Sequence, residues 1–503
     1  MKDRASSVAA EVRTAPQRRW QLVLFLVLAL SYGYFYQGGG WNQNGRFDLV
    51  RALVEHGTAR IDAYHENTGD KALFRGSYYS DKAPGTSWFG VPFYGLAHAS
   101  LQGRVPHHRF LALSSYVATL GAVGMPTAAA VVLLAWIVGS LGLARGWEPT
   151  VAAAYGLGTL TFPYATLFYG HQLAAALLLA GFASLVAVRR GIGHPRAVLA
   201  GAGVALGLSV AVEYTSLLAL VALVGYAAAV IRPGRYLGWL LAGLVLSGSL
   251  LLWYHAAVFG SPMALPYHYS TQTHRHAGVF MGLGAPAPEV IWSLLIGSYR
   301  GLFFSAPWLV LALPGAALLI RRRASRPEGL VCAAIFLLFL WVNASLIDWE
   351  GGWTLGPRYL IPTLPFLAIC AAGALQPRPK ADVWTRLRSV LVFLAMAVSV
   401  LLMLIGTAVK PEVPKEIEAP WTSFLVPHFF SGELSLNRTS FDDRWPGSAR
   451  QAWNLGEIAG LDGLASLLPL LALWGFAAGF MMWSRELSPR RFGLFRAGAR
   501  GSG

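Results

Sequence analysis

The sequence predicts an all-α integral membrane protein, a polytopic bundle of about twelve transmembrane helices. Of its 503 residues, 55% are apolar and only 13% are charged, whereas a typical soluble domain has about 25% charged residues. The mean hydropathy is +0.49, and nearly charge-free runs long enough to cross a bilayer recur along the chain. Together these observations exclude a disordered chain, a coiled coil and a cytosolic enzyme.

The chain is basic, with 40 lysines and arginines against 24 aspartates and glutamates, a net charge of +16. Such a balance is typical of nucleic-acid-binding proteins as well as of proteins on anionic membranes. Here much of the excess lies in short loops on one side of the expected spans, such as Arg189-Arg190 and Arg321-Arg322-Arg323. This distribution follows the positive-inside rule. It places these loops in the cytoplasm and argues against a nucleic-acid partner.

We expect both termini in the cytoplasm and twelve crossings, each needing ~20 largely apolar residues. The charge-free stretch 110–144 has Pro126 near its middle, and we expect one long kinked helix there. The stretch 150–188 is too long for one helix, so we expect a hairpin that turns at residues 169–172. The expected spans are 20–37, 109–142, 150–168, 171–188, 196–212, 214–231, 236–258, 302–320, 329–346, 359–376, 389–409 and 463–483.

This topology gives a transmembrane domain over 20–483 between cytoplasmic tails at 1–19 and 484–503. Three long segments lie outside, at 38–108, 259–301 and 410–462, and the first is the richest in charge. The sequence has no Walker loop and no Rossmann glycine pattern. We therefore expect the chemistry on the outer face. The Ala-, Gly- and Arg-rich composition favours a bacterial plasma membrane.

The first outer segment contains a stretch with helical spacing, with Phe47, Val50 and Val54 on one face. Gly57 is expected to end this helix. We interpret it as an amphipathic helix at the membrane interface, and the alternative is a scaffold helix with solvated charges. The apolar run 88–101 is short and interrupted by Pro92, so we expect an interfacial or half-inserted helix there.

Two motifs in this segment resemble the lipid-dependent glycosyltransferases of the GT-C superfamily. Arg51-Ala52-Leu53 to Gly57 matches a family pattern Arg-x-Met/Leu-x-x-x-Gly, and Tyr79-Ser80-Asp81-Lys82-Ala83-Pro84 is similar to Tyr-x-Glu-Lys-Pro-Pro. The most similar members are the aminoarabinose transferases of lipid A and the dolichyl-phosphate-mannose protein mannosyltransferases. In the same register, Asn42-Gln43 stand where those families carry an acidic pair.

The resemblance implies a GT-C-like bundle with a large first outer loop bearing interfacial helices. It also implies transfer of a sugar from a polyprenyl-phosphate donor to an acceptor (a glycan, a lipid or a protein) by inverting displacement. It further implies substrate-binding roles for Tyr79 and Lys82.

Such a transfer needs cations that hold the leaving phosphate and one carboxylate that takes a proton from the acceptor hydroxyl. Arg46 and Lys82 are the candidate cations of the first outer segment, and Asp48 and Asp81 are the nearest carboxylates. For Asp81 and Lys82 the alternative is a local ion pair that caps the next helix.

Two polar residues at turns between apolar runs are further candidates. Glu213 is a candidate catalytic carboxylate, because ionisable residues near the membrane usually have a function or a partner. At a hairpin turn it can equally be solvated. His171, at an outer turn, is expected either to contact substrate or to cap a helix.

Candidates for substrate binding also lie near later spans, namely Arg300, Arg358 and Tyr359. Arg358 either binds phosphate or extends its charge to the interface. Nearby tryptophans either stack on a sugar or belong to the aromatic belt. Asp348 and Glu350 have a spacing that suits a divalent metal ion, the only cofactor suggested, although two carboxylates alone are too few.

Two other functions remain alternatives. A twelve-span secondary transporter would show internal repeats and polar residues at mid-membrane, whereas the expected spans have almost no charges. A polymerase or ligase of surface glycans would use the same lipid chemistry, so the sequence does not separate it from a glycosyltransferase. The sugar and the acceptor are not specified.

Overall fold

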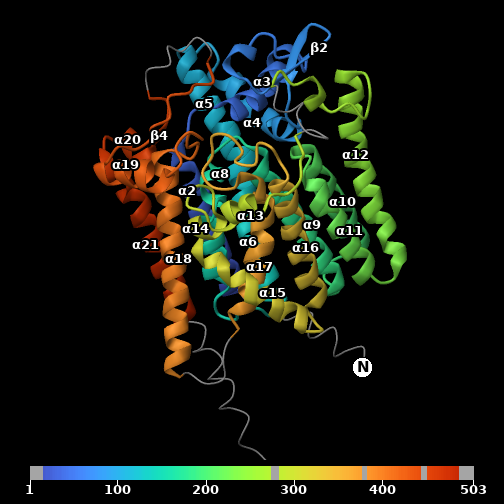
Figure 1. The fold of residues 1–503 in the computed structure, drawn as a ribbon, viewed down its shortest axis with the longest axis vertical. Coiled ribbons are helices and arrows are strands. Elements are labelled where there is room, and N and C mark those ends of the chain that lie inside the picture. The colour runs from blue at the N-terminus through green and yellow to red at the C-terminus, as the bar shows by residue number, and fades with distance from the viewer. Residues whose placement is uncertain (1–14, 273–281, 377–381, 443–449, 487–503) are drawn as a thin grey trace, which may run out of the picture.

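In the computed structural model, residues 15–272, 282–376, 382–442 and 450–486 are described. Long helices run side by side, and the short elements of the first outer segment gather at one end, the top in Figure 1. In the first half the elements are α2 (Ala15–Gly33), β1 (Phe35–Tyr36), α3 (Trp41–His56), β2 (Lys71–Phe74), β3 (Ser77–Ser80), α4 (Gly85–Leu101), α5 (His107–Thr119), α6 (Met125–Ser140), α7 (Glu148–Leu157), α8 (Thr161–Ala165), α9 (Gly170–Arg189), α10 (Pro195–Val212), α11 (Ser216–Val230) and α12 (Leu237–Phe259).

The second half continues in the same helical pattern. Its elements are α13 (Pro288–Leu295), α14 (Leu302–Ser305), α15 (Ala312–Arg321), α16 (Arg326–Ala344), α17 (Leu364–Ala374), α18 (Val383–Val409), α19 (Val426–Ser431), β4 (Trp453–Asn454), α20 (Leu455–Ile458) and α21 (Leu468–Glu486). The predicted helical bundle is confirmed, and the described residues also contain four short strands in two antiparallel pairs, β1–β4 and β2–β3.

Seven helices of the described chain are long and apolar enough to cross a membrane, and four shorter apolar helices accompany them. All eleven coincide with expected spans, but the number of twelve crossings is not confirmed. Residues 150–168 do not form one transmembrane helix, contrary to expectation. They form α7 and α8, of 10 and 5 residues. At 1.5 Å per residue, α7 covers about 15 Å, half of a bilayer core.

The long charge-free stretch before residue 144 forms one helix, as predicted. It runs unbroken over His107–Ser140 for 34 residues, and a π-helical turn at Leu120–Gly124 joins α5 to α6. This turn directly precedes Pro126, which has no backbone N–H to donate within the helix. The irregularity therefore lies where the sequence placed the kink.

The segments predicted for the two sides of the membrane lie at opposite ends of the bundle. At one end Arg189 pairs with Glu328 and also donates to the carbonyl of Ala324, which joins two basic loops. At the other end Asn437 donates to the carbonyl of Gln37 (2.6 Å), which joins the third outer segment to the first. Figure 1 shows α3 and β2 at the top and α15 at the bottom.

Helix α3 differs from the interfacial helix that the sequence predicts. It ends at Gly57, whose φ of 63° closes the helix in the left-handed conformation, as expected. It begins earlier, at Trp41, and residues 42–52 are buried on every face, including Arg46 and Asp48. The other outer segments cover it, so its charges meet protein rather than solvent.

The remainder of the first outer segment is a hairpin followed by a helix. Strands β2 and β3 pair in register with Ala72 opposite Tyr79. Helix α4 continues through Pro92 without a break, so the expected interruption at this residue is wrong. A proline inside a helix is tolerated where neighbouring helices support the backbone, and α4 packs against both α3 and α5.

Candidate functional site

A cavity of about 920 Å³ opens among the outer segments. This volume is in the range of small-molecule binding sites. Its walls come from the start of α3, the loop before β2, the 347–358 loop and the segment after α18. The lining residues are Gly40, Trp41, Asn42, Asp70, Tyr169, Thr271, Gln272, Ile347, Asp348, Glu350, Gly351, Gly352, Trp353, Arg358, Glu412, Lys415, Glu416, Asn437 and Thr439.

Arg358 is a buried cation in the wall of this cavity. It begins the 3₁₀ turn Arg358–Thr363 that leads into α17, and 8% of the residue is exposed. Its two terminal nitrogens donate to the hydroxyls of Tyr169 and Tyr359, both at 3.4 Å. Its buried Nε has no hydrogen-bond partner among the described residues. Within the described chain its hydrogen bonds are therefore two long ones to neutral phenols, and Tyr169 joins it to Glu412.

Glu412 is a buried carboxylate in the same cavity, three residues after the end of α18. Its Oε1 accepts from the hydroxyl of Tyr169 (2.7 Å) and its Oε2 from Nε2 of Gln43 (2.9 Å). Burial raises the pKa of this carboxyl, although the hydrogen bond from Tyr169, the charge of Lys410, the bond from Gln43 and the charge of Arg358 all lower it.

Arg46, Glu213 and His171 form a second buried group. Nη2 of Arg46 lies 3.0 Å from Oε2 of Glu213, and Nδ1 of His171 lies 3.4 Å from the same oxygen. Glu213 follows the end of α10, and His171 is in the first turn of α9, so two helix ends meet α3 here. Glu213 is therefore paired and buried rather than solvated at a hairpin turn.

Lys82 lies between two carboxylates. Its Nζ is 2.8 Å from Oδ2 of Asp70 and 3.0 Å from Oδ1 of Asp81. The hydroxyl of Ser270, from the second outer segment, donates to Asp81 at 2.9 Å. All three charged residues are buried, so this is not the exposed local ion pair of the alternative interpretation. Asp70 extends the group to the cavity wall.

Contacts join the first two of these groups. The rings of His171 and Tyr359 meet edge to face, with centroids 5.7 Å apart, and the hydroxyl of Tyr359 accepts from Arg358. Five residues chosen from the sequence are thus brought together: Arg46, His171, Glu213, Arg358 and Tyr359. They come from segments that are distant in the chain.

Other predicted residues lie elsewhere or are covered. Asp48 is fully buried and accepts from Asn67 (3.1 Å). Asp48 and Asp81 are not among the residues that line the cavity. Tyr79 packs in an apolar cluster with Phe259. Arg300 is buried and donates to the carbonyl of Thr354 at 2.7 Å, so its guanidinium supports the 347–358 loop.

Asp348 and Glu350 both line the cavity. Within the described residues, no three histidine, cysteine, aspartate or glutamate side chains gather closely enough to hold a metal ion. A metal ion here would therefore need ligands of another kind, such as carbonyl oxygens or a substrate phosphate. The metal site stays a prediction.

Sequence reasoning missed two cavity carboxylates, Asp70 and Glu412. Asp70 lies in a polar loop that nothing in the sequence distinguishes. Glu412 carries a usable signal, because Lys410-Pro411-Glu412 directly follows the apolar run 389–409. An ionisable residue at the end of a span is a functional candidate. Gln43 was recognised only as a departure from an acidic pattern, not as a partner of Glu412.

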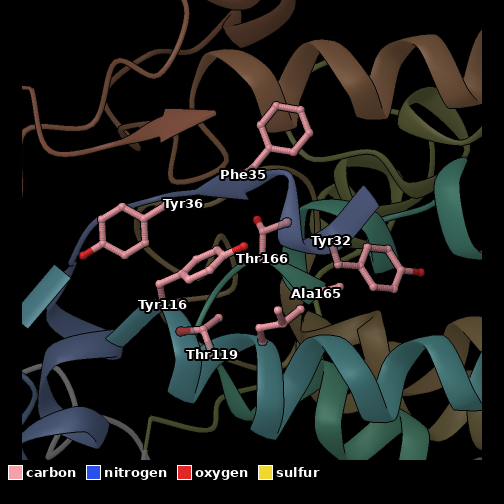
Figure 2. A pocket seen from close by; sticks show the side chains of 8 residues that line it. Tyr32, Phe35, Tyr36, Tyr116, Thr119, Ala165 and Thr166 are labelled. Atoms are coloured by element: carbon pink, nitrogen blue, oxygen red, sulfur yellow. The ribbon is translucent and has the colours of Figure 1, made fainter. Parts of the chain in front are cut away.

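A much smaller cavity, of about 10 Å³, lies between β1, the middle of the α5–α6 helix and α8. Figure 2 shows its aromatic lining, with Tyr32, Phe35, Tyr36 and Tyr116 around Thr119, Ala165 and Thr166. Its volume suits at most one water molecule. It is a packing gap rather than a substrate site.

Comparison with known proteins gives a structural likeness. No family model matches the chain, and no curated protein does. The structure of ArnT from Cupriavidus metallidurans bound to undecaprenyl phosphate matches with a TM-score of 0.50 and 17% identity, over 82% of this chain and 70% of ArnT.

The oligosaccharyltransferase AglB from Archaeoglobus fulgidus, in complex with an inhibitory peptide and a dolichol-phosphate, is also similar. Its TM-score is 0.46 at 13% identity, over 87% of this chain and 62% of AglB. At such identities the likeness concerns the fold alone. The chain therefore shares the fold of ArnT, a likeness that agrees with the resemblance of its first-loop motifs.

Proposed function

We propose that the protein is a membrane glycosyltransferase that takes a sugar from a polyprenyl-phosphate donor and transfers it to an acceptor on the outer face. The observation that carries this proposal is Arg358, a buried guanidinium at the cavity wall with an unpartnered Nε and only phenol oxygens as hydrogen-bond acceptors. A planar guanidinium suits a phosphate group, which it can bind through two parallel hydrogen bonds.

Two further features support this proposal. The cavity contains carboxylates that can accept a proton, Asp70 and Glu412 among them. The fold is that of ArnT, whose structure holds undecaprenyl phosphate.

Binding of the lipid phosphate tests the proposal directly. The purified full-length protein is titrated with undecaprenyl phosphate in detergent, and its thermal stability is followed, because a ligand that binds the folded state stabilises it. We expect stabilisation in the wild type and a loss of affinity of about tenfold or more in Arg358→Met, which removes a charge-assisted contact. Arg104→Met, which removes an exposed cation of the outer side, is the control.

Transfer is then measured with undecaprenyl-phosphate donors labelled in the sugar, a panel of pentoses and hexoses, and native membrane extract as the acceptor. The proposal is supported if the wild type releases label from a donor and Arg358→Met does not. If undecaprenyl phosphate does not stabilise the wild type and none of the labelled donors loses its sugar, the proposal is wrong. Uptake of free sugar into vesicles would then favour the transporter. The chemical nature of the labelled product, a single sugar or a polymer, identifies a surface-glycan polymerase or ligase.

A further inference from the structure

We propose that Glu412, from the third outer segment, is the catalytic base that takes the proton from the acceptor hydroxyl. This inference rests on the glycosyl transfer proposed above and names the residue that performs its proton transfer. The resemblance places an acidic pair at positions 42–43, where this chain has Asn42 and Gln43. The structure shows a carboxylate from another segment bonded to this position.

The side chain of Gln43 holds Glu412 in a fixed orientation. The backbone N–H of Phe168 donates to Oε1 of Gln43 at 3.0 Å. Oε1 is therefore the acceptor, and the Nε2 amide group is left to donate to Glu412. Tyr169 donates to the other carboxylate oxygen. Two donors thus hold the carboxylate at the cavity wall, while each of its oxygens keeps a lone pair for an acceptor hydroxyl.

Glu412 is also better suited to accept a proton than the carboxylates of the first outer segment. In the described part of the chain it forms no salt bridge, whereas Asp70 lies 2.8 Å from Nζ of Lys82. A cation in contact stabilises the ionised form of a carboxylate and makes it a weaker base. Asp48 and Asp81 are fully buried and do not line the cavity. The burial that raises the pKa of Glu412 makes it a stronger base than an exposed glutamate.

The step balances without a further reactant. The acceptor oxygen forms a bond to the anomeric carbon of the sugar as its proton moves to a carboxylate oxygen of Glu412. The bond between the anomeric carbon and the phosphate oxygen breaks, and its electron pair stays on the lipid phosphate, where Arg358 neutralises the added charge. Glu412 then releases the proton to water. The products are the glycosylated acceptor, the lipid phosphate and one proton.

The first test compares Glu412→Gln with Glu418→Gln, an exposed carboxylate in the same segment that does not line the cavity. Loss of a general base typically costs about 100-fold to 10,000-fold in rate. We expect a fall of this size in kcat for Glu412→Gln, with affinity for undecaprenyl phosphate within about threefold of wild type. Glu418→Gln is expected to match wild type. Wild-type kcat in Glu412→Gln would overturn the assignment.

The second test exchanges the two residues in the double variant Gln43→Glu/Glu412→Gln. The exchange keeps an amide bonded to a carboxylate and moves the charge across a single hydrogen bond. We expect the double variant to stay as slow as Glu412→Gln, because Gln43 does not line the cavity and a carboxylate at its position is not presented to the acceptor. A purely structural role for Glu412 predicts recovery, since the hydrogen bond is kept, and recovery would also overturn the proposal.

The pH profile is a third readout. The charged and titratable groups that face Glu412 are Tyr169 at the start of α9, Arg358 before α17 and Lys410 at the end of α18. Since burial raises the pKa of Glu412, kcat should fall on acidification at a higher pH than for an exposed glutamate. The fall should be absent from the residual activity of Glu412→Gln. If it remains there unchanged, another group is the base.

These outcomes separate the two proposals. If the wild type binds undecaprenyl phosphate and transfers sugar while Glu412→Gln is equally active, only the base assignment fails. If the wild type neither binds the lipid phosphate nor transfers sugar, the glycosyltransferase function itself fails. Binding of undecaprenyl phosphate also reports whether Glu412→Gln is folded.

Discussion

The ion pair between Arg46 and Glu213 shows how strongly the protein depends on single buried charges. The two side chains are 2% and 8% exposed and 3.0 Å apart. Removing one partner of such a pair leaves an uncompensated buried charge, at a cost of about 3–5 kcal/mol. Replacing both by apolar residues removes that penalty. The pair thus offers a way to separate stability from function.

We expect Glu213→Ala to lower the free energy of unfolding by about 3 kcal/mol. The double variant Arg46→Met/Glu213→Leu should recover most of this loss and still bind undecaprenyl phosphate more weakly than wild type, because a cation is missing. Thermal unfolding in detergent and lipid titration provide the two measurements. Wild-type affinity in the double variant would show that Arg46 has only a structural role.

Gly40 leaves the space in which the Glu412 carboxylate lies. A Cβ atom at position 40 would be 2.5 Å and 2.6 Å from its two oxygens. The φ of Gly40 is 172°, an extended conformation open to any residue, so the effect of a substitution comes from this contact alone. We expect Gly40→Ala to displace Glu412 and lower kcat on the order of 100-fold, with lipid-phosphate affinity retained. Gly95→Ala, where the added atom meets open space, is the control.

At this scale the sequence identifies the buried cations better than Glu412. Arg46, Lys82 and Arg358 are candidates in the sequence because a leaving phosphate requires positive charge, and all three are buried in the folded chain. Glu412 was missed because its significance depends on Gln43, 369 positions away in the chain. The sequence offers Asp48, Asp81 and Glu213 as carboxylates, and only the folded chain shows Glu412 bonded to Gln43.

Among the elements, α10 and α12 pack so closely that glycine is needed between them. A Cβ atom at Gly203 would overlap the backbone of Leu240, whereas one at Gly201, on another face of α10, meets open space. Small residues allow membrane helices to approach in this way. The same substitution at the two glycines therefore tests the packing of these helices.

We expect Gly203→Ala to destabilise the protein by about 1–3 kcal/mol, since the added methyl group pushes the helices apart. Gly201→Ala should be neutral or stabilising by about 0.5–1 kcal/mol, because alanine favours a helix more than glycine does. Thermal unfolding of the two variants in detergent is the measurement. Equal stability of the two would contradict the close packing of α10 and α12.

Element positions follow well from the sequence where the apolar runs are long, as at 107–140 and 170–189. The predicted positions are wrong where the packing of the folded chain overrides the local sequence pattern. The charge-free run 150–168 contains Gly158 and Pro163 and breaks between α7 and α8. The charges of α3 suggested an interfacial helix because the sequence does not show that other outer segments bury it.

For the whole molecule, the distribution of basic residues predicts an orientation that labelling can test. Glu416 and Arg323 are exposed and lie in segments predicted for opposite sides of the membrane. The native cysteines, Cys332 and Cys370, are buried. In right-side-out vesicles, a membrane-impermeant maleimide should label Glu416→Cys and not Arg323→Cys. Both should react after the membrane is permeabilised. The reverse pattern in intact vesicles would invert the topology.

The hydrogen bond between Gln43 and Glu412 also has a consequence for biosynthesis. A ribosome adds about 5–20 residues per second, so roughly 20 to 70 s separate the synthesis of these two residues. During that interval the nascent chain already has Lys82 and Arg46 in place but lacks its base. A product truncated before residue 412 would contain the motifs of the first outer segment but would lack the base, so we expect it to be inactive. Activity therefore requires synthesis and insertion of the chain at least as far as residue 412.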